Sequence, residues 1–255
     1  MWEVIHGDCR SVLPTLTGID LVVTSPPYAM QRKAQYGGIP EAEYPDWTVG
    51  WMRALLPALT ERASVMINIR EHVKGGQMSD YVHRTRMALR ADGWVECDEI
   101  VWYKPNAMPI GDPGRPRRSW ERVLWFSRSP RPTVVANGNG KPSNRIGYVG
   151  SKVNPSWCNS TTTTLRSGIA RHADICMIPT TNECGQHPAV YPTALPAYLI
   201  RGWSKPGATV LDPFSGSGST GVACIQTGRN YIGVEQSAEY CELARKRISE
   251  ATEGK

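Results

Sequence analysis

Two short motifs contain the side chains best suited to chemistry. The first, TSPPY at residues 24–28, follows the apolar run IDLVV and combines a hydroxyl, two prolines and an aromatic ring. Because proline has no backbone N–H and a fixed φ, Pro26 and Pro27 cannot continue a strand and instead hold a rigid loop with fixed carbonyl directions. Two prolines alone are also typical of a simple stiff turn. A functional interpretation of this motif therefore requires support from a second motif elsewhere in the chain.

The second motif is the glycine-rich stretch DPFSGSGST at residues 212–220. Gly216 and Gly218 permit positive φ and a close approach of a ligand to the backbone, and the helix expected after them supplies free N–H groups. The following strand ends at Glu235, where the acid of a Rossmann-like unit accepts hydrogen bonds from ribose hydroxyls. This order of elements predicts a site for a cofactor that carries adenosine.

The chemistry of the loop narrows the choice of cofactor. A phosphate-binding P-loop requires a Lys-Ser/Thr pair after the glycines, and GSGST has none. Gly216, Gly218 and Gly221 do meet the GxGxxG pattern of dinucleotide sites, so an NAD-linked oxidoreductase stays open. Asp212 argues against it, because a carboxylate at the strand end would repel a pyrophosphate but could pair with the α-ammonium group of S-adenosylmethionine.

Alternating apolar runs and helical patterns predict the elements that position both motifs. Buried strands are expected over 19–25, 63–69, 93–104, 208–214 and 230–235, and helices over 48–60, 81–90, 192–204, 218–228 and 237–251. A long loop is expected from Ala29 to Trp47. The alternation predicts an α/β fold, a parallel sheet with helices on both faces. Residues 105–185 are rich in Pro, Gly, Asn, Ser and Thr, with one strand candidate at 122–127, and are expected to form an irregular surface insertion.

The charge of the chain is concentrated in that insertion. The net charge is +6, but twelve basic and only two acidic residues lie between Lys104 and Ala173, which leaves −4 for the rest of the chain. A basic segment on an acidic body indicates a polyanionic partner, nucleic acid, against the alternative of a solvated charged loop. We take Lys104, Arg115, Arg117 and Arg118 as its candidate DNA contacts.

Composition excludes several other classes. No apolar stretch approaches the roughly 20 residues that span a membrane, and the N-terminus has no signal-peptide core. The seven cysteines are scattered with no CxxC pair, so neither a disulfide framework nor a metal site is expected, and the cytoplasm is the expected compartment.

TSPPY, together with HPAVYPTALPAYLIRGWSKPGATVLDPFSGSGSTGVACIQTGRNYIGVE at 187–235, resembles the permuted (β-group) amino-DNA methyltransferases. These enzymes methylate the exocyclic amine of cytosine (N4) or adenine (N6). The resemblance implies a circularly permuted, Rossmann-like S-adenosylmethionine-dependent methyltransferase fold. Residues 1–104 would form its catalytic half, 105–185 a target-recognition insertion, and 186–255 its cofactor-binding half.

The resemblance also implies roles for single residues. The catalytic motif would be Ser25, Pro26, Pro27 and Tyr28. Asp8 in HGDC would lie beside the adenine of the cofactor, although it also suits a helix N-cap, and His187 would help to close the methionine end, although a plain turn is as good an explanation. The ribose-binding acid would be Glu235, and the cofactor loop would comprise Asp212, Pro213, Phe214, Gly216, Ser217 and Gly218.

The exocyclic amine of a base is a poor nucleophile because its lone pair is delocalised into the ring. Ser25 and the Pro26 carbonyl could accept the two amine protons, and Tyr28 could offer a flat face to a base that has left the stack. Methylation at carbon 5 is excluded, since the family that performs it uses a Pro-Cys nucleophile and this chain has no Pro-Cys.

The neutral serine at position 25 resembles the SPP[YF] form that is common in the N4-cytosine enzymes, whereas the adenine enzymes of this order more often have Asp there. The resemblance therefore favours cytosine N4, with adenine N6 as the alternative. A DNA-binding protein without turnover is a further alternative. The implied partner is double-stranded DNA; a homodimer and a cognate restriction endonuclease stay open.

Overall fold

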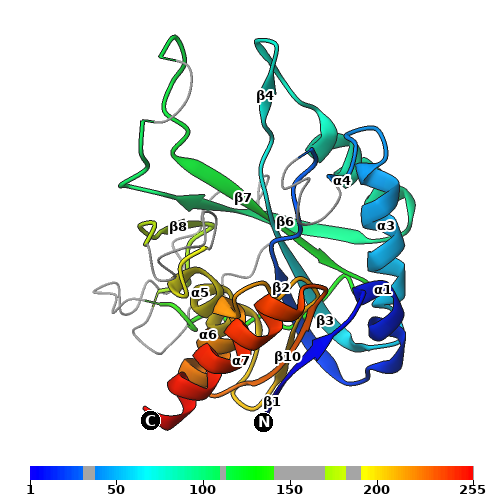
Figure 1. The fold of residues 1–255 in the computed structure, drawn as a ribbon, viewed down its shortest axis with the longest axis vertical. Helices are drawn as coiled ribbons and strands as arrows, with labels where there is room; N and C mark the ends of the chain where they lie inside the picture. Colours follow the sequence, from blue (N-terminus) through cyan, green and yellow to red (C-terminus); the bar gives the residue numbers. More distant parts are fainter. Residues whose placement is uncertain (31–37, 110–112, 141–169, 182–190, 255) are drawn as a thin grey trace, which may run out of the picture.

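The buried apolar runs pair into one mixed sheet. The computed structural model describes residues 1–30, 38–109, 113–140, 170–181 and 191–254. Within them, eight strands form the sheet in the order β1-β10-β9-β2-β3-β7-β6-β8 (Figure 1). Their bounds, in that order, are Trp2–His6, Asn230–Glu235, Thr209–Asp212, Ile19–Thr24, Leu59–Ile69, Trp120–Ser127, Val95–Tyr103 and Ile175–Met177.

The first five strands of that order are parallel, and β7 is antiparallel to both of its neighbours. Strand β8 runs parallel to β6 at the far edge. Because parallel strands end at the same edge of a sheet, the carboxyl ends of β2, β3, β9 and β10 lie together. This edge is where α/β folds bind their ligands.

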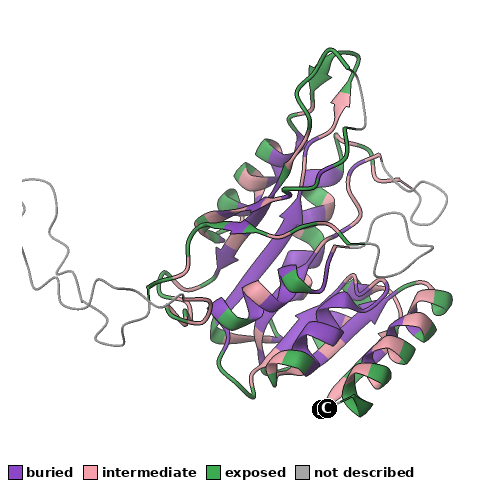
Figure 2. Ribbon diagram, turned by 90° about the vertical axis from the view of Figure 1, so that its left-hand side faces the viewer, coloured by how far each residue is buried: buried purple, intermediate pink, exposed green. Residues whose placement is uncertain are grey.

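Helices cover both faces of the sheet. On one face lie α1 (Cys9–Val12), the short η1 (Leu13–Thr15), α3 (Tyr44–Ala54) and α4 (Tyr81–Ala91); on the other lie α5 (Ala194–Trp203), α6 (Ser219–Thr227) and α7 (Ala238–Glu253). Side chains of β3 alternate between the two cores, since Met66 packs with the α5–α7 cluster while Val65 and Ile67 pack with the α1–α4 cluster. Figure 2 shows burial concentrated on the strands between these layers.

The α/β class and the predicted parallel strands are confirmed. Residues 31–37 of the loop expected from Ala29 to Trp47 lie outside the described residues, and the C-terminal end of that expectation is wrong, because α3 begins at Tyr44, with Pro45 in its first turn. Tyr44 is fully buried, so packing extends the helix into a stretch whose polar composition favours a loop.

Within the segment 105–185, residues 110–112, 141–169 and 182–185 lie outside the described residues, and the described remainder departs from expectation. Its one predicted strand forms as β7, but β7 lies in the interior of the sheet between β3 and β6. This part of the segment belongs to the core and is not a surface insertion. A two-stranded hairpin, β4 (Val73–Lys74) with β5 (Gln77–Met78), projects beyond the sheet at the top of Figure 1. None of the described helices is long and apolar enough to cross a bilayer.

Candidate active site

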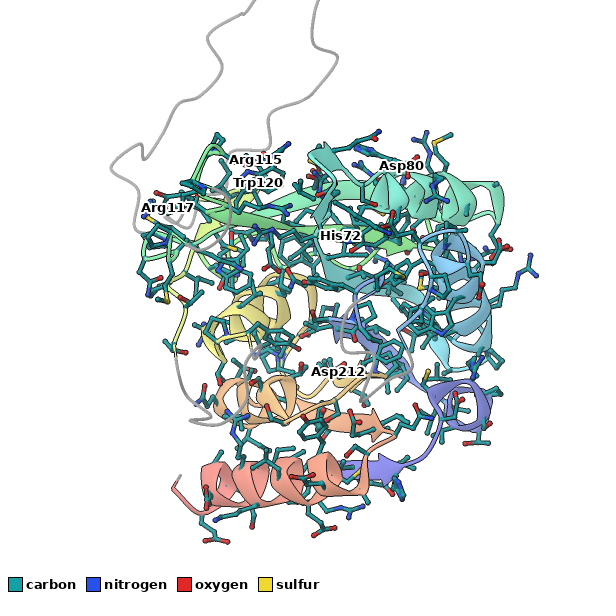
Figure 3. All side chains as sticks on the ribbon, turned by 45° about the horizontal axis from the view of Figure 1, so that its top comes forward. His72, Asp80, Arg115, Arg117, Trp120 and Asp212 are labelled. Carbon is teal, nitrogen blue, oxygen red and sulfur yellow. The ribbon has the colours of Figure 1, made fainter. Side chains whose placement is uncertain are left out.

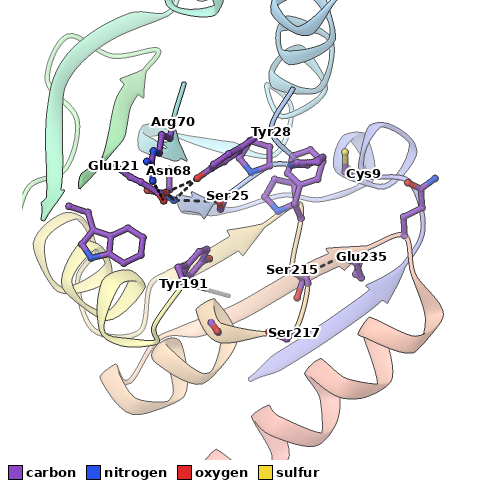
Figure 4. A pocket seen from close by; sticks show the side chains of 18 of the residues that line it. Cys9, Ser25, Tyr28, Asn68, Arg70, Glu121, Tyr191, Ser215, Ser217 and Glu235 are labelled. Carbon is purple, nitrogen blue, oxygen red and sulfur yellow. Dashed lines mark hydrogen bonds and ion pairs between the residues drawn. The ribbon is translucent and has the colours of Figure 1, made fainter. Parts of the chain in front are cut away.

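A cavity of about 810 Å³ opens at the carboxyl ends of β2, β3, β9 and β10. Its walls come from segments that are distant in the sequence (Figure 4). The loop 25–28 follows β2, the loop 213–217 follows β9, Asn68 lies at the end of β3, and Glu235 ends β10. The fold therefore brings both sequence motifs to one cavity.

On one side of the cavity, Glu235 joins the glycine loop to the start of α7. Its Oε2 accepts the Gly216 N–H at 2.8 Å, and its Oε1 accepts the Ser237 N–H at 2.8 Å. Gly216 has φ 51°, and a Cβ placed on it would meet nothing closer than the Phe214 carbonyl oxygen at 3.9 Å. The space beside this backbone is open, as the close approach of a ligand requires.

Gly218 has positive φ for a different reason. At φ 81° it caps the N-terminus of α6, and a Cβ there would lie 2.9 Å from the Cβ of Ala244 in α7. The element that approaches Gly218 closely in this direction is therefore α7. Arg247 of α7 holds the same loop from outside by donating to the Ser217 carbonyl at 2.7 Å.

Asp212 is buried behind the cavity wall. Its Oδ1 accepts the Thr24 hydroxyl at 2.7 Å and the Phe214 N–H at 3.1 Å, and its Oδ2 accepts the Thr220 hydroxyl at 2.6 Å and the Tyr191 hydroxyl at 3.2 Å. Burial raises the pKa of the Asp212 carboxyl to about 6, although these hydrogen bonds oppose the shift. These hydrogen bonds connect the end of β2 to the glycine loop through Asp212, and its pairing with the α-ammonium group of a cofactor stays a prediction.

Of the described residues predicted to hold a cofactor, Asp8, Pro213, Phe214, Gly216, Ser217 and Glu235 line the cavity, whereas Asp212 and Gly218 do not. Asp8 also caps α1 by accepting the Arg10 N–H at 2.9 Å. Hydrogen bonds from the Arg10 side chain lower the pKa of Asp8 despite its partial burial. The N-cap interpretation of Asp8 is confirmed, and its place beside the adenine of a cofactor stays a prediction. His187 lies outside the described residues.

Sequence reasoning missed an aromatic wall. Trp47 lines the cavity, and its ring lies 5.5 Å from that of Phe214. Trp51, fully buried behind them, meets the Phe214 ring edge-on at 5.4 Å. Trp47 and Trp51 are four residues apart on α3, a spacing that the sequence does show and that fits one helix face.

On the other side of the cavity lie Ser25, Pro26, Pro27 and Tyr28, in front of a buried polar cluster. The Tyr28 hydroxyl donates to Glu121 Oε2 at 2.8 Å, and the Asn68 amide donates to the same oxygen at 2.9 Å and to the Tyr28 oxygen at 3.0 Å. The amide also reaches Ser25 Oγ at 3.5 Å, a long contact. Figure 4 shows the labelled side chains of Ser25, Tyr28, Asn68 and Glu121 converging at this side of the cavity.

Lys104 corrects the predicted DNA contacts. It is 8% exposed, and its ammonium group pairs with Glu121 in the same cluster, so it lies at the cavity wall and not on the outer surface. Arg122 is also buried and pairs with Glu71 at 3.0 Å. The count of basic residues in the insertion therefore overstates the charge on its surface, because a charge count carries no information on burial.

The three arginines predicted alongside Lys104 lie nearer the surface. Arg115 donates to the Gly76 carbonyl in the β4–β5 turn, Arg117 to the Ala107 carbonyl at 3.2 Å, and Arg118, which lines the cavity, to the Glu71 carbonyl. Figure 3 shows Arg115 and Arg117 on the side of the molecule away from α7. The described residues contain no group of three or more His, Cys, Asp or Glu that could hold a metal ion.

Comparisons with known proteins agree with this geometry. A family model described as DNA methylase matches residues 19–246. The chain is 29% identical to the Type II methyltransferase M.SmaI of Serratia marcescens, over 96% of its own length and 90% of the relative's.

Two solved structures show the same fold. PvuII DNA methyltransferase, described as cytosine-N4-specific, has a TM-score of 0.74 at 22% identity, covering 99% of this chain and 91% of that one. A putative DNA modification methylase from Thermus thermophilus, solved with S-adenosyl-L-methionine, has a TM-score of 0.67 at 24% identity, covering 100% of this chain and 98% of that one.

Proposed function

The chain belongs to the DNA methylase family, and on that premise we propose that it transfers a methyl group from S-adenosylmethionine to N4 of a cytosine flipped out of double-stranded DNA. One observation carries this proposal: neighbouring parallel strands bring the Ser25–Tyr28 loop and the Gly216–Glu235 site to a single cavity. A cavity that serves a cofactor at one wall and a rigid pair of acceptors at the other suits group transfer between two bound molecules.

The residues on the cofactor side fit S-adenosylmethionine. The Glu235 carboxylate ends β10 at the cavity wall, where it accepts the Gly216 and Ser237 N–H groups, and a carboxylate at this place in a Rossmann-like unit is the acceptor that ribose hydroxyls require. Phe214 and Trp47 supply an apolar wall for an adenine ring. The cofactor supplies a methyl group bound to a positively charged sulfur.

On the target side, the chain positions the amine and localises its lone pair. The Ser25 hydroxyl and the Pro26 carbonyl accept the two amine protons, and the two prolines keep these acceptors from moving apart. The Tyr28 hydroxyl is engaged by Glu121, so the ring keeps one orientation and offers its face to the base. Positioning and fixed dipoles, with no covalent intermediate on the protein, account for the acceleration.

The proposal also specifies which exocyclic amine is methylated. The neutral Ser25 and the SPPY form support cytosine N4, and adenine N6 is the alternative because both bases carry an exocyclic amine. Single-molecule sequencing of DNA from cells that express the protein tests base and recognition sequence together. We expect N4-methylcytosine at one short recognition sequence. Finding only N6-methyladenine would show that the target base is adenine, and the proposed methylation of an exocyclic amine would still hold.

The remaining assignments are tested separately. Thermal stabilisation by S-adenosylmethionine and not by NAD is expected, and the reverse would favour an oxidoreductase. Methyl incorporation into DNA would exclude a binding protein without turnover. Arg115, Arg117 and Arg118 stay predicted DNA contacts. A homodimer, a cognate restriction endonuclease and the cytoplasmic compartment stay predictions.

A further inference from the structure

A buried carboxylate, Glu121, stands behind the loop 25–28, and its contacts extend well beyond the Tyr28 hydroxyl. It lies on β7, and its side chain contacts groups from three other segments: the Tyr28 hydroxyl, the Asn68 amide of β3, and the Lys104 ammonium group just after β6. Arg70 is a more distant cation, at 3.9 Å from Oε1. All five side chains line the cavity.

The ionisation state of Glu121 determines which groups in this cluster donate hydrogen bonds and which accept them. Burial opposes the ionisation of Glu121, but Lys104 and the hydrogen bonds from Lys104, Tyr28 and Asn68 outweigh it and hold the pKa of the carboxyl below its ordinary value. An ionised carboxylate only accepts, so the Tyr28 hydroxyl must donate to it. That leaves the Tyr28 oxygen to accept from Asn68, whose amide also reaches Ser25 Oγ.

A buried ion pair is poor evidence for stability, since an apolar replacement of similar volume is often neutral or better. The chain offers a direct comparison on the same strand. Arg122 of β7 pairs with the buried Glu71, and neither residue lines the cavity. The Lys104–Glu121 pair differs by contacting a residue of the catalytic loop, which indicates a role in that loop.

We propose that Glu121, held by Lys104, is a positioning residue for the flipped base: it fixes the Tyr28 ring and the Asn68 amide, and through them the geometry of Ser25. The inference rests on the proposed methyltransferase function. Glu121 does not touch the reacting atoms; it acts by locking the hydroxyl of Tyr28, so that the ring face stays aligned while the amine is held by its acceptors.

Glu121→Gln tests the proposal, because it keeps the size of the side chain and removes its charge. Glu71→Gln is the matched control, a buried partner of an arginine on the same strand but away from the cavity. On a duplex carrying the recognition sequence found by sequencing, Glu121→Gln should lower kcat about 10- to 100-fold, the range that small misplacements cost. Its S-adenosylmethionine affinity, measured by calorimetry, should stay within about twofold of wild type, and Glu71→Gln should keep nearly wild-type kcat.

Two results would overturn the proposal. One is a kcat for Glu121→Gln equal to that of Glu71→Gln. The other is a loss of kcat matched by an equal loss of cofactor affinity, which indicates general damage. A wild-type protein that methylates no DNA contradicts the proposed function itself, whereas an active wild type with an unaffected Glu121→Gln contradicts this inference alone.

Tyr28→Phe provides a second variant that does not depend on the folding of Glu121→Gln. It removes the hydroxyl that Glu121 holds and keeps the ring. We expect a kcat reduced about tenfold at unchanged cofactor affinity, and a double variant no slower than Glu121→Gln alone, because both changes break one link. Full activity of Tyr28→Phe, or effects of the two changes that simply multiply, would show that Glu121 does not act through Tyr28.

Discussion

Replacing Gly218 by alanine tests two requirements for glycine at this position, the positive φ of its backbone and the close packing of α7 against it. An alanine at φ 81° costs about 1–2 kcal/mol of backbone strain, offset by about 0.4–1 kcal/mol from a less flexible unfolded chain. The new Cβ would also lie 2.9 Å from the Cβ and 3.0 Å from the Cα of Ala244, so α7 must shift. Such overpacking typically costs a further 1–3 kcal/mol, roughly. We expect Gly218→Ala to lower the free energy of unfolding by about 2–4 kcal/mol in total.

Gly228→Ala is the matched control. Gly228 ends α6 at φ 72°, and a Cβ there would meet no atom within 4 Å, so this variant reports backbone strain alone. The difference between the two variants should be about 2 kcal/mol, or roughly 4–8 °C in Tm for a chain of this size, measured by thermal and urea unfolding. Equal destabilisation would refute the inference that helix packing requires Gly218.

Four further predictions follow from the same geometry. Glu235→Gln replaces one acceptor by a donor that faces a backbone N–H, so S-adenosylmethionine affinity should fall by about 1.5–3 kcal/mol in calorimetry, while Glu239→Gln, at an exposed position of α7, should leave it unchanged. Ser25→Ala should cut kcat with cofactor affinity nearly intact, because the lost acceptor matters mainly in the transition state; equal losses would place Ser25 in cofactor binding. Neutralising Arg117 and Arg118 should weaken DNA binding and flatten its salt dependence, and an unchanged slope would remove both from the interface. Burial raises the pKa of Asp212 to about 6, above its unfolded value, so its contribution to stability is full below about pH 4 and is lost as the pH rises through 6. Asp212→Asn should remove this slope, at most about 3 kcal/mol, from unfolding curves measured across that range.

Local pattern predicted the parts of the molecule that depend on nearby residues. The apolar runs around 19–25 and 208–214 became β2 and β9, and Ser237 caps α7 by accepting the Tyr240 N–H, as a serine before a helical pattern suggests. The backbone conformations of the diproline loop and the glycine loop could also be predicted, because they depend on the proline and glycine residues within those loops. Both loops follow strands that were predicted to be parallel, and the carboxyl ends of parallel strands lie at one edge of a sheet. The position of both loops at the same cavity therefore follows from the predicted strand direction.

The polar cluster behind the catalytic loop depends on pairings that no local pattern reveals. Glu121 meets Tyr28 only because β7 pairs antiparallel with β3 and β6 in the interior of the sheet. In the sequence, Glu121 is an isolated acid in a basic segment, and Lys104 is one more positive charge. Their burial depends on strand order, which is why a count of charges assigned Lys104 to a DNA surface and overlooked Glu121.

A single hydrogen bond illustrates how the two motifs depend on each other. Thr24, the residue before Ser25, donates to Asp212 at 2.7 Å, across a separation of 188 residues. Asp212 in turn begins the glycine loop, so the end of β2 and the end of β9 are joined at the point where the loops 25–28 and 213–217 diverge. Since both strands run in the same direction within the sheet, their carboxyl ends meet whichever comes first along the chain. The functional unit is therefore the pair of neighbouring strand ends, and the order in which the chain supplies them can be permuted without moving the site.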